Sequence, residues 1–424
     1  MPLVGEAPVS HGAARRLTIA RLGHKGDGET DDGIFVPLSA PGDQIVAEVD
    51  GERASIARIV TPGPDRVDAT CPHFGACGGC ALQHLSVGFL SDWKREQIAT
   101  ALGQRGLTGI EVAPTRVMPP QSRRRAELHA RVTQMGIKIG FLERGSRVIV
   151  PMSACDVLTP AILGALDALG VQLEPLLPLH THVAMHVLDS EHGLDVSLGI
   201  PDFALDIRSR QALSAMAAAV DLARLSVNGE LIIMRREPVV TIAGVPVVPP
   251  PESFLQAVRE AEVHMQDLAC KALVSTKVVA DLFAGIGTFA FALARTAKVH
   301  AVEGEQSALD ALAAAARRTQ GLKPISTERR DLFRRPLLAH ELKAFDGVVL
   351  NPPRPGAKAQ AEALAQSAVP ALVYVSCSPA SFARDARILV DGGFELKTVT
   401  PVDQFLWTPH IEAVGIFERR VKRR

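Results

Sequence analysis

Short alternating runs of apolar and polar residues fill the N-terminal part of the chain. Four such runs lie at 17–22, 34–38, 44–49 and 53–60, and turn-forming residues separate them. The Asp50-Gly51 pair between the last two is typical of a β-hairpin. Closely spaced turns favour a small OB-type barrel over a hairpin attached to a larger domain. We therefore predict a barrel for residues 1–65.

A mixed pattern follows. Helical spacing occurs at 91–106, 160–169 and 211–225, and strand-like runs occur at 183–187, 194–198 and 231–235. The first of these helices is expected to begin at Ser91 and to end at Gly106. A proline-rich joint near Val247 marks a boundary. We place a mixed α+β central domain at 66–246.

Regular alternation dominates the C-terminal part. Strand-like runs lie at 278–283, 298–302, 347–350 and 372–375, and helical runs lie at 288–297 and 307–318. Strands that alternate with helices of this length predict a doubly wound parallel sheet. We therefore expect an α/β fold, with a Rossmann-like domain at 247–424.

Composition narrows the functional class. The 424 residues are 47% hydrophobic, the formal net charge is zero, and no apolar run is long enough for a membrane helix. The N-terminus has no apolar core of signal-peptide type, so we expect a cytoplasmic protein, a monomer without a membrane partner. Basic residues are local, because 116–147 holds eight Lys and Arg against two Asp and Glu. Arg123, Arg124 and Arg125 in this stretch are candidate RNA contacts, although such a run is also typical of a solvated face.

A glycine-rich turn suggests a nucleoside site. Asp281 begins the segment DLFAGIGTF, in which Gly285 and Gly287 would let the backbone pass close to a ligand. Glu303 ends the next strand, where a carboxylate can bind ribose hydroxyls, and Asp331 follows a further strand. Because no Walker lysine follows the glycines, a nucleoside triphosphate is not expected. S-adenosylmethionine carries no phosphate and needs no anion cradle, so it fits better than a dinucleotide cofactor of hydride transfer.

Three further residues follow strands of the same sheet or begin a strand. Cys377 ends a buried strand before a proline-started helix, whose N-terminus would lower the thiol pKa and favour a nucleophile; a buried apolar role, which suits Cys270, is the alternative. Asn351, in NPPR, offers an amide that can match a uracil edge, or simply forms a turn. Glu412 is a candidate general base or a solvated acid.

Four cysteines suggest a metal or cluster site. Cys71, Cys77 and Cys80 lie within CPHFGACGGC, and Cys155 is more distant. A cytosolic chain of this size does not need a disulfide framework. Thiolates in this number can hold either zinc or an iron–sulfur cube, and the uneven spacing favours the cube.

Several segments, taken in order, resemble the RNA (uracil-5-)-methyltransferases. These are DLFAGIGTF, RDLF, NPPRPGA, YVSCSPASFARD and TPHIEAVGIF, and the segment LGHKGDG…FVPLSAPGD is similar to the TRAM barrel of that family. The cysteine spacing resembles the family's four-cysteine [4Fe–4S] motif. TRAM plus cluster is the pattern of the enzymes that methylate 23S ribosomal RNA, so 23S rRNA is the expected partner and Lys25 of the barrel a candidate contact. A tRNA uridine is the alternative substrate.

The resemblance implies roles for single residues. Cys377 would add to C6 of uracil, and Glu412 would remove the C5 proton after methyl transfer. Gln256, in SFLQ, matches a glutamine that contacts S-adenosylmethionine, while Gly285, Glu303 and Asp331 match the glycine loop and the ribose and adenine acids.

Two positions depart from the family. Asn351 replaces a common aspartate where cofactor and base meet, and Val258 replaces a frequent asparagine. Two other interpretations remain open. The NPP motif suggests a methyltransferase for an exocyclic amine, and the two departures suggest a cluster-bearing RNA-binding module with an inactive methyltransferase domain.

Overall fold

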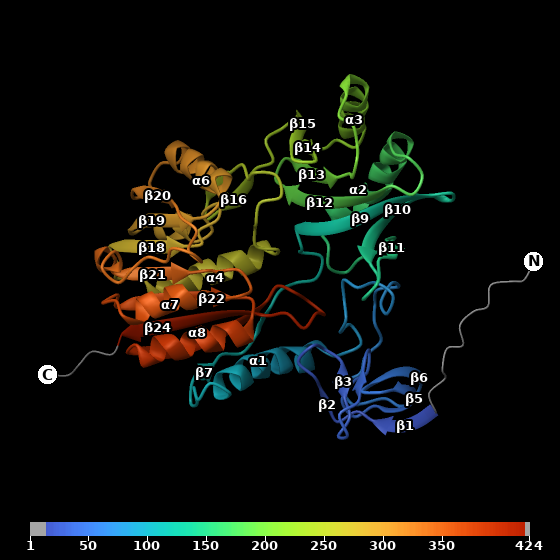
Figure 1. Ribbon diagram of the computed structural model, residues 1–424, viewed down its shortest axis with the longest axis horizontal. Coiled ribbons are helices and arrows are strands. Elements are labelled where there is room, and N and C mark those ends of the chain that lie inside the picture. The colour runs from blue at the N-terminus through green and yellow to red at the C-terminus, as the bar shows by residue number, and fades with distance from the viewer. Residues whose placement is uncertain (1–13, 420–424) are drawn as a thin grey trace, which may run out of the picture. The chain divides into compact units, whose positions relative to one another are not determined.

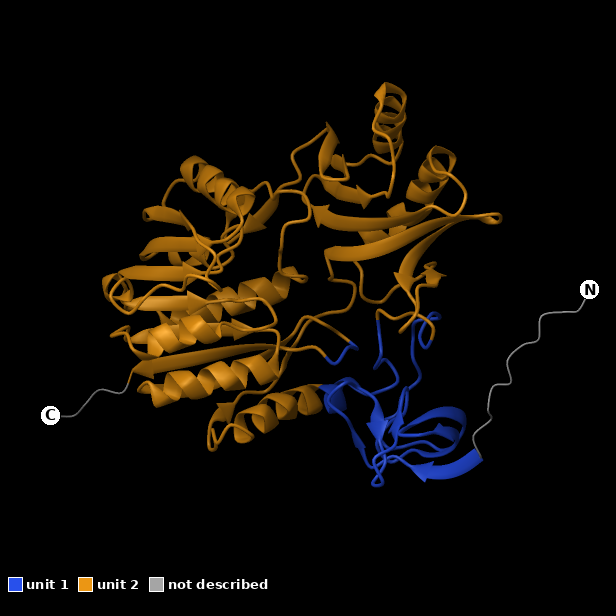
Figure 2. Cartoon of the chain, viewed as in Figure 1, with its two compact units in different colours: residues 1–75, 80–90, 407–409 blue, residues 76–79, 91–406, 410–424 orange. Residues whose placement is uncertain are grey.

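A computed structural model describes residues 14–419, and the chain divides into two compact units (Figure 2). Unit 1 comprises residues 1–75, 80–90 and 407–409, and unit 2 comprises 76–79, 91–406 and 410–424. Residues 1–13, which carry most of the segment behind the cytoplasmic expectation, lie outside the described range. Within that range no helix is long and apolar enough to cross a membrane.

Unit 1 contains a six-stranded sheet in the order β1-β5-β6-β4-β3-β2. Its strands are β1 (Ala14–Thr18), β2 (Arg21–Leu22), β3 (Gly28–Glu29), β4 (Phe35–Val36), β5 (Gln44–Asp50) and β6 (Arg53–Thr61). The Asp-Gly hairpin is confirmed, because Asp50 pairs with Arg53. Asp43 is buried and binds Arg66 and the Gly63 amide, which fixes the loops beside the sheet. A multistranded N-terminal β domain thus forms as predicted, but the unit extends beyond residue 65.

The central part of unit 2 is a seven-stranded sheet in the order β11-β10-β9-β12-β13-β14-β15 (Figure 1). Its elements are β9 (Arg125–Thr133), β10 (Gly136–Leu142), β11 (Ile149–Pro151), α2 (Pro160–Leu173), the 3₁₀ turn η1 (Glu174–Leu176), β12 (His182–Ser190), β13 (Gly193–Gly199), α3 (Ile207–Ala219), β14 (Arg224–Val227) and β15 (Glu230–Met234). The predicted helix 211–225 is wrong at its end, because Asp221 has a φ of 58° and the chain turns there into β14. Arg224 then forms a buried ion pair with Asp195 on β13.

The C-terminal part of unit 2 is the predicted α/β domain. Its sheet has the order β20-β19-β18-β21-β22-β24-β23-β7, and the first five strands are parallel. Its strands are β18 (Val278–Leu282), β19 (Lys298–Glu303), β20 (Ile325–Arg329), β21 (Gly347–Leu350), β22 (Ala371–Ser376), β23 (Phe394–Asp403), β24 (Glu412–Arg419) and the short strand β7 (Glu111–Val112). The hairpin β16 (Val240–Ile242) and β17 (Val245–Val247) precedes it.

Helices cover both faces of this sheet (Figure 1). The helical elements are α4 (Arg259–Ala272), α5 (Ala290–Leu293), α6 (Gln306–Arg318), the 3₁₀ turn η2 (Leu342–Ala344), α7 (Lys358–Ala365) and α8 (Pro379–Asp391). Adjacent strand residues face opposite layers: Val279 packs in the core with α4 and α6, and Ala280 in the core with α7 and α8. The fold is therefore a three-layered, doubly wound sheet, as the alternation of elements predicts.

Residues 91–117 depart from the predicted domain boundaries. Helix α1 (Val87–Gly103) begins four residues earlier than expected, because the Ser86 hydroxyl accepts a hydrogen bond from the Phe89 amide. Its residues Ile98 and Leu102 pack in the core of the C-terminal sheet, which β7 (Glu111–Val112) and β8 (Arg116–Val117) extend at the β23 edge. This stretch therefore belongs structurally with the α/β domain and not with the central one.

A buried ion pair fastens α1 to the end of β23. Lys94 Nζ lies 2.6 Å from Asp403 Oδ1, and both side chains are almost completely buried. Lys94 also donates a hydrogen bond to the Phe405 carbonyl oxygen at 3.1 Å. One ammonium group thus holds the residues on both sides of Gln404.

We predict that Lys94→Met lowers the free energy of unfolding by about 3–5 kcal/mol, because Asp403 is left as an uncompensated buried charge. Urea denaturation followed by circular dichroism measures this loss. Lys94→Met combined with Asp403→Leu should recover much of it, since an apolar pair can replace a buried ion pair. A double variant as unstable as the single one would contradict this explanation.

Candidate functional site

The carboxyl ends of the parallel strands meet at one edge of the C-terminal sheet, where open α/β sheets bind ligands. A cavity of about 680 Å³ lies at this edge, within unit 2. Eight of the residues singled out from the sequence line it, namely Arg125, Gln256, Gly285, Glu303, Asp331, Asn351, Cys377 and Glu412. The structure therefore brings both proposed reactive residues and most of the proposed cofactor residues to one cavity.

Strand register places Glu412 beside Cys377. Cys377 follows the last residue of β22, Ser376, which pairs with Ala413 of the antiparallel strand β24. Glu412 is the first residue of β24 and thus reaches the edge where the parallel strands end. The two strands run in opposite directions, so the end of β22 lies beside the beginning of β24. The first supplies Cys377 and the second supplies Glu412.

Burial raises the proton affinity of both groups. Burial raises the pKa of the Cys377 thiol, the Glu412 carboxylate raises it further, and the Arg354 guanidinium opposes both. The expectation of a lowered thiol pKa is therefore wrong, because burial and a neighbouring acid outweigh the groups that lower it. Burial raises the pKa of Glu412 to about 7, and a hydrogen bond from Gln404 opposes the shift. A carboxyl group with this pKa can act as a base at neutral pH.

Gln404 is a site residue that the sequence analysis missed. Its Nε2 atom donates to Glu412 Oε1 at 3.1 Å and to Gln256 Oε1 at 2.7 Å. All three side chains are buried and line the cavity. No periodicity or motif distinguishes this glutamine in the segment VDQF, since only strand pairing brings it to Glu412.

Glu303 is bound by the glycine-rich loop. Its carboxylate accepts hydrogen bonds from the backbone amides of Gly285 at 3.0 Å and Gly304 at 2.6 Å. Gly285 has a φ of 55°, and a Cβ placed on it would meet no atom within 4 Å. The loop therefore leaves open space directly beside an acid, an arrangement that suits a ribose.

Two residues of the same motif do not line the cavity. Asp281 is fully buried, and burial raises its pKa to about 8. A Cβ on Gly287 would lie 2.6 Å from the Phe291 ring, so this glycine serves close packing and not close approach of a ligand. The structure therefore does not place Asp281 or Gly287 where a ligand in the cavity would contact it.

Aromatic rings flank the remaining wall. Phe283 and Phe333 have ring centroids 5.3 Å apart, and both line the cavity beside Asp331. The Asp331 carboxylate accepts the Phe333 amide at 3.0 Å, which fixes this turn. Val258, the second departure from the family, packs in the core and not in the cavity, while its amide donates to Gln404.

The three consecutive arginines have different surroundings: Arg124 binds protein groups, whereas Arg125 lines the cavity. Arg124 is buried, pairs with Glu262 at 2.9 Å and donates to the Gln256 carbonyl oxygen. It is thus committed to protein groups, which corrects its assignment as an RNA contact. Arg125 lies over the Phe254 ring, 5.1 Å from the centroid, and lines the cavity; Arg123 donates to the Arg125 carbonyl oxygen.

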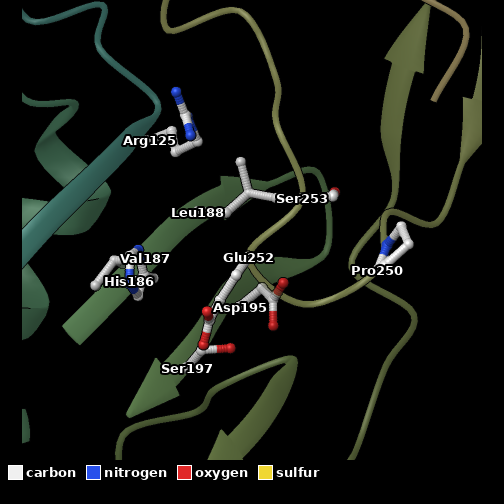
Figure 3. A pocket seen from close by; sticks show the side chains of 9 residues that line it. All are labelled: Arg125, His186, Val187, Leu188, Asp195, Ser197, Pro250, Glu252 and Ser253. Carbon is white, nitrogen blue, oxygen red and sulfur yellow. The ribbon is translucent and has the colours of Figure 1, made fainter. Parts of the chain in front are cut away.

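A second, much smaller cavity borders Arg125 in unit 2 (Figure 3). Strands β9, β12 and β13 and the loop at 250–253 form its wall, and Figure 3 shows Asp195 and Ser197 of β13 there. Its volume of about 30 Å³ has room for only a few water molecules. It is therefore too small for a nucleoside.

The cysteines occupy different environments. Cys155 Sγ accepts hydrogen bonds from the amides of Val157 and Leu158, and Cys77 Sγ accepts one from Gly79, all at 3.4–3.5 Å. Cys71 and Cys80 belong to unit 1, whose Lys25 is exposed. Among the residues that the structure describes, no group of three or more His, Cys, Asp or Glu side chains is arranged to hold a metal ion.

Comparison with known proteins places these features in a family context. A sequence profile described as tRNA (Uracil-5-)-methyltransferase matches residues 247–421. An RNA methyltransferase of Caulobacter vibrioides is 45% identical over 416 residues, covering 95% of this chain and 99% of the relative. The 23S rRNA (uracil(1939)-C(5))-methyltransferase RlmD of Halomonas elongata is 32% identical, covering 95% of this chain and 89% of that protein.

A solved structure has a similar fold. The crystal structure of Pyrococcus abyssi tRNA (uracil-54, C5)-methyltransferase in complex with S-adenosyl-L-homocysteine aligns with a TM-score of 0.74 at 23% identity. The alignment covers 95% of this chain and 99% of that one. The likeness therefore includes the β-rich N-terminal part and the central part as well as the α/β domain.

The raised pKa of Glu412 gives a prediction about stability. A carboxyl group with its pKa raised from 4.5 to about 7 stabilises the fold below pH 4.5, and this contribution is lost as the pH rises through 7. Glu412→Gln removes the titration. The variant should therefore gain stability relative to the wild type by about 3 kcal/mol between pH 4.5 and 8, measured by urea denaturation. Asp281 is present in both proteins, so its contribution to the pH dependence of stability cancels in the difference between them. A difference that does not change with pH would refute the buried, titrating carboxyl group.

Proposed function

The chain belongs to the RNA (uracil-5-)-methyltransferase family, and we propose that it methylates C5 of a uridine in 23S ribosomal RNA through a covalent enzyme–uracil adduct. The observation that carries the proposal is the shared cavity of Cys377 and Glu412 at the edge of the sheet. RNA uracil-5 methyltransfer with S-adenosylmethionine is the activity of the family. The covalent route, the residue roles and the ribosomal substrate are our proposals.

The chemistry needs one nucleophile and one base. C5 of uracil is a weak nucleophile, so the Cys377 thiolate adds to C6 and turns C5 into an enolate carbon. When bound, S-adenosylmethionine supplies the methyl group that this carbon takes up. Glu412 then accepts the C5 proton, the C5–H electron pair forms the C5=C6 double bond, and the Cys377–C6 bond breaks to return the thiolate.

The cofactor side of the cavity is proposed to consist of Glu303, Gly285, Asp331, Gln256 and Asn351. Glu303 would bind the ribose hydroxyls, since it lies at the strand end beside the open Gly285 loop. Asp331 would bind the adenine, which the Phe283 and Phe333 rings can flank. The uncharged Asn351 amide is suited to the uracil edge, to which it can both donate and accept.

Ribosomal RNA is the proposed substrate because the relative that acts on 23S rRNA aligns over nearly the whole of this chain. A tRNA uridine is the second candidate, since the matching family profile is described for tRNA. Arg123, Arg125 and Lys25 are proposed phosphate or base contacts. Arg125 borders the cavity and stacks on the half-exposed Phe254 ring.

Cys71, Cys77, Cys80 and Cys155 are proposed to hold a [4Fe–4S] cluster. Support comes from the uneven spacing and from the amide hydrogen bonds to Cys77 and Cys155, since hydrogen bonds to sulfur are a recurring feature of such ligands. The cluster would stabilise the region that binds RNA. No step of the methyl transfer is assigned to it.

RNA that contains 5-fluorouracil tests the nucleophile. Fluorine cannot leave C5 as a proton does, so the wild-type protein with S-adenosylmethionine should form an adduct that survives denaturing electrophoresis. Cys377→Ala should form none, because the C6 bond cannot be made. Cys270→Ala is the matched control, since Cys270 is a residue of α4 that packs against the core, and it should react like the wild type. An adduct formed by Cys377→Ala would refute the assignment.

Substrate choice is tested with two RNAs lacking 5-methyluridine. Protein incubated with radioactive S-adenosylmethionine should label protein-free 23S rRNA transcript at least tenfold faster than bulk tRNA transcript. Nuclease digestion and chromatography then identify the labelled nucleoside as 5-methyluridine. Faster labelling of tRNA would overturn the ribosomal proposal and favour the tRNA alternative.

Metal content tests the cluster. Anaerobically purified protein should be brown, with broad absorbance near about 400 nm and roughly four irons per chain. Cys155→Ser should lose iron and weaken RNA binding more than S-adenosylmethionine binding, because Cys155 lies outside the cofactor cavity. Colourless protein with one zinc and no iron would contradict the proposal.

A further inference from the structure

Gln404 lies between the cofactor side and the base side of the cavity. Its Nε2 atom donates one hydrogen bond to Gln256 Oε1 at 2.7 Å and the other to Glu412 Oε1 at 3.1 Å. The Gln404 side chain is only 3% exposed, and both of its acceptors are buried as well. A primary amide has two N–H donors, so these two contacts use all of them.

The orientation of the Gln404 amide is determined by its surroundings. Its Oε1 atom accepts the backbone amide of Val258 at 3.4 Å, and Val258 N–H can only donate. Exchanging nitrogen and oxygen would place a donor against a donor, and an oxygen against the Glu412 carboxylate. The NH₂ group must therefore face Gln256 and Glu412.

The backbone at Gln404 is held on both sides. Lys94 Nζ pairs with Asp403 at 2.6 Å and donates to the Phe405 carbonyl oxygen at 3.1 Å. The Phe405 amide donates to Asp403 Oδ1 at 3.1 Å. Gln404 thus lies between two fixed residues, which makes its side chain a rigid donor.

These contacts have a consequence on each side. Since the Gln256 oxygen accepts from Gln404, its nitrogen is the end of the amide that remains for a ligand. At the other end, a donor to Glu412 favours the charged carboxylate over the neutral acid. The hydrogen bond from Gln404 opposes the rise in the pKa of Glu412 that burial causes. It therefore supports the ionised carboxylate, which is the form that can accept a proton.

We propose that Gln404 is a positioning residue that fixes the cofactor-side amide of Gln256 and holds the Glu412 carboxylate ready to remove the C5 proton. The proposal rests on the proposed function of Glu412 and deepens it. Gln404 forms no bond to the reacting atoms in this account. Its effect is to couple occupation of the cofactor side to the base through one shared amide.

Gln404→Met tests the proposal, because methionine keeps the unbranched shape but has no N–H donor. With uridine RNA, elimination should slow about tenfold to a hundredfold, the loss expected for a hydrogen bond to a charged group. A methylated covalent adduct should then accumulate. The KM for S-adenosylmethionine should also rise, since Gln256 is no longer oriented.

The pH profile separates positioning from general damage. Losing the donor should raise the pKa of Glu412 and move the rise of the elimination rate about one to two units toward higher pH. Gln404→Glu puts a second carboxyl group against Glu412 and should move it further. The other titratable or charged side chains nearby are unchanged in these variants, namely Cys377, Arg354, His410, Asp403 and Lys94.

Two further variants test whether the effect is specific to Gln404. Gln360→Met removes another buried glutamine, which binds the Leu337 backbone away from the cavity, and should leave the pH profile unchanged. In a Glu412→Gln background, Gln404→Met should add little, because both changes act on the same step. Additive effects on elimination would contradict the proposal.

Adducts on 5-fluorouracil RNA distinguish failure of the proposed covalent function from failure of the proposal for Gln404. Their formation does not need proton removal, so Gln404→Met should form them at a saturating cofactor concentration as the wild type does, which also shows that it is folded. If the wild type forms none, the proposed covalent function fails. If the wild type does and Gln404→Met turns over uridine RNA with the wild-type pH profile, the proposal for Gln404 alone is overturned.

Discussion

The antiparallel pairing of β24 with β22 is the constraint on which the candidate site depends. The parallel strands can bring only residues at their carboxyl ends to the cavity, and Cys377 is one of these. Glu412 arrives from the opposite direction, because Ser376 pairs with Ala413. A register slip of one residue would turn the Glu412 side chain to the other face of the sheet. The nucleophile and the base are thus placed by one strand pair.

This placement has an energetic cost that suits the chemistry. Glu412 is buried beside a thiol, so its charged form is disfavoured and its pKa rises to about 7. The gain is a base that is partly ionised at neutral pH and able to accept a proton. Gln404 limits the cost by one hydrogen bond, and Lys94 fixes the backbone from which Gln404 extends. The buried pair of Arg124 and Glu262 supports the Gln256 segment in the same way.

Sequence patterns predicted the fold class and most of the cofactor and reactive residues that meet at the cavity, for a physical reason. In a parallel sheet all carboxyl ends share one edge, so residues such as Glu303, Asn351 and Cys377 can be brought together without knowing any contact. Gln404 could not be found this way, since its role depends on strand register and on two partners far apart in sequence. Arg124 appeared to be a surface charge because its partner, Glu262, follows 138 residues later.

In the proposed mechanism, Glu412 removes the C5 proton after the methyl group has been transferred. Release of tritium from RNA carrying [5-³H]uridine measures this step directly. Wild-type protein should release one tritium for each methyl group transferred. Glu412→Gln should transfer one methyl group per enzyme molecule. It should release tritium more slowly than the wild type by a factor of about one hundred or more, as expected for loss of a general base. Tritium release by Glu412→Gln at the wild-type rate would contradict the account.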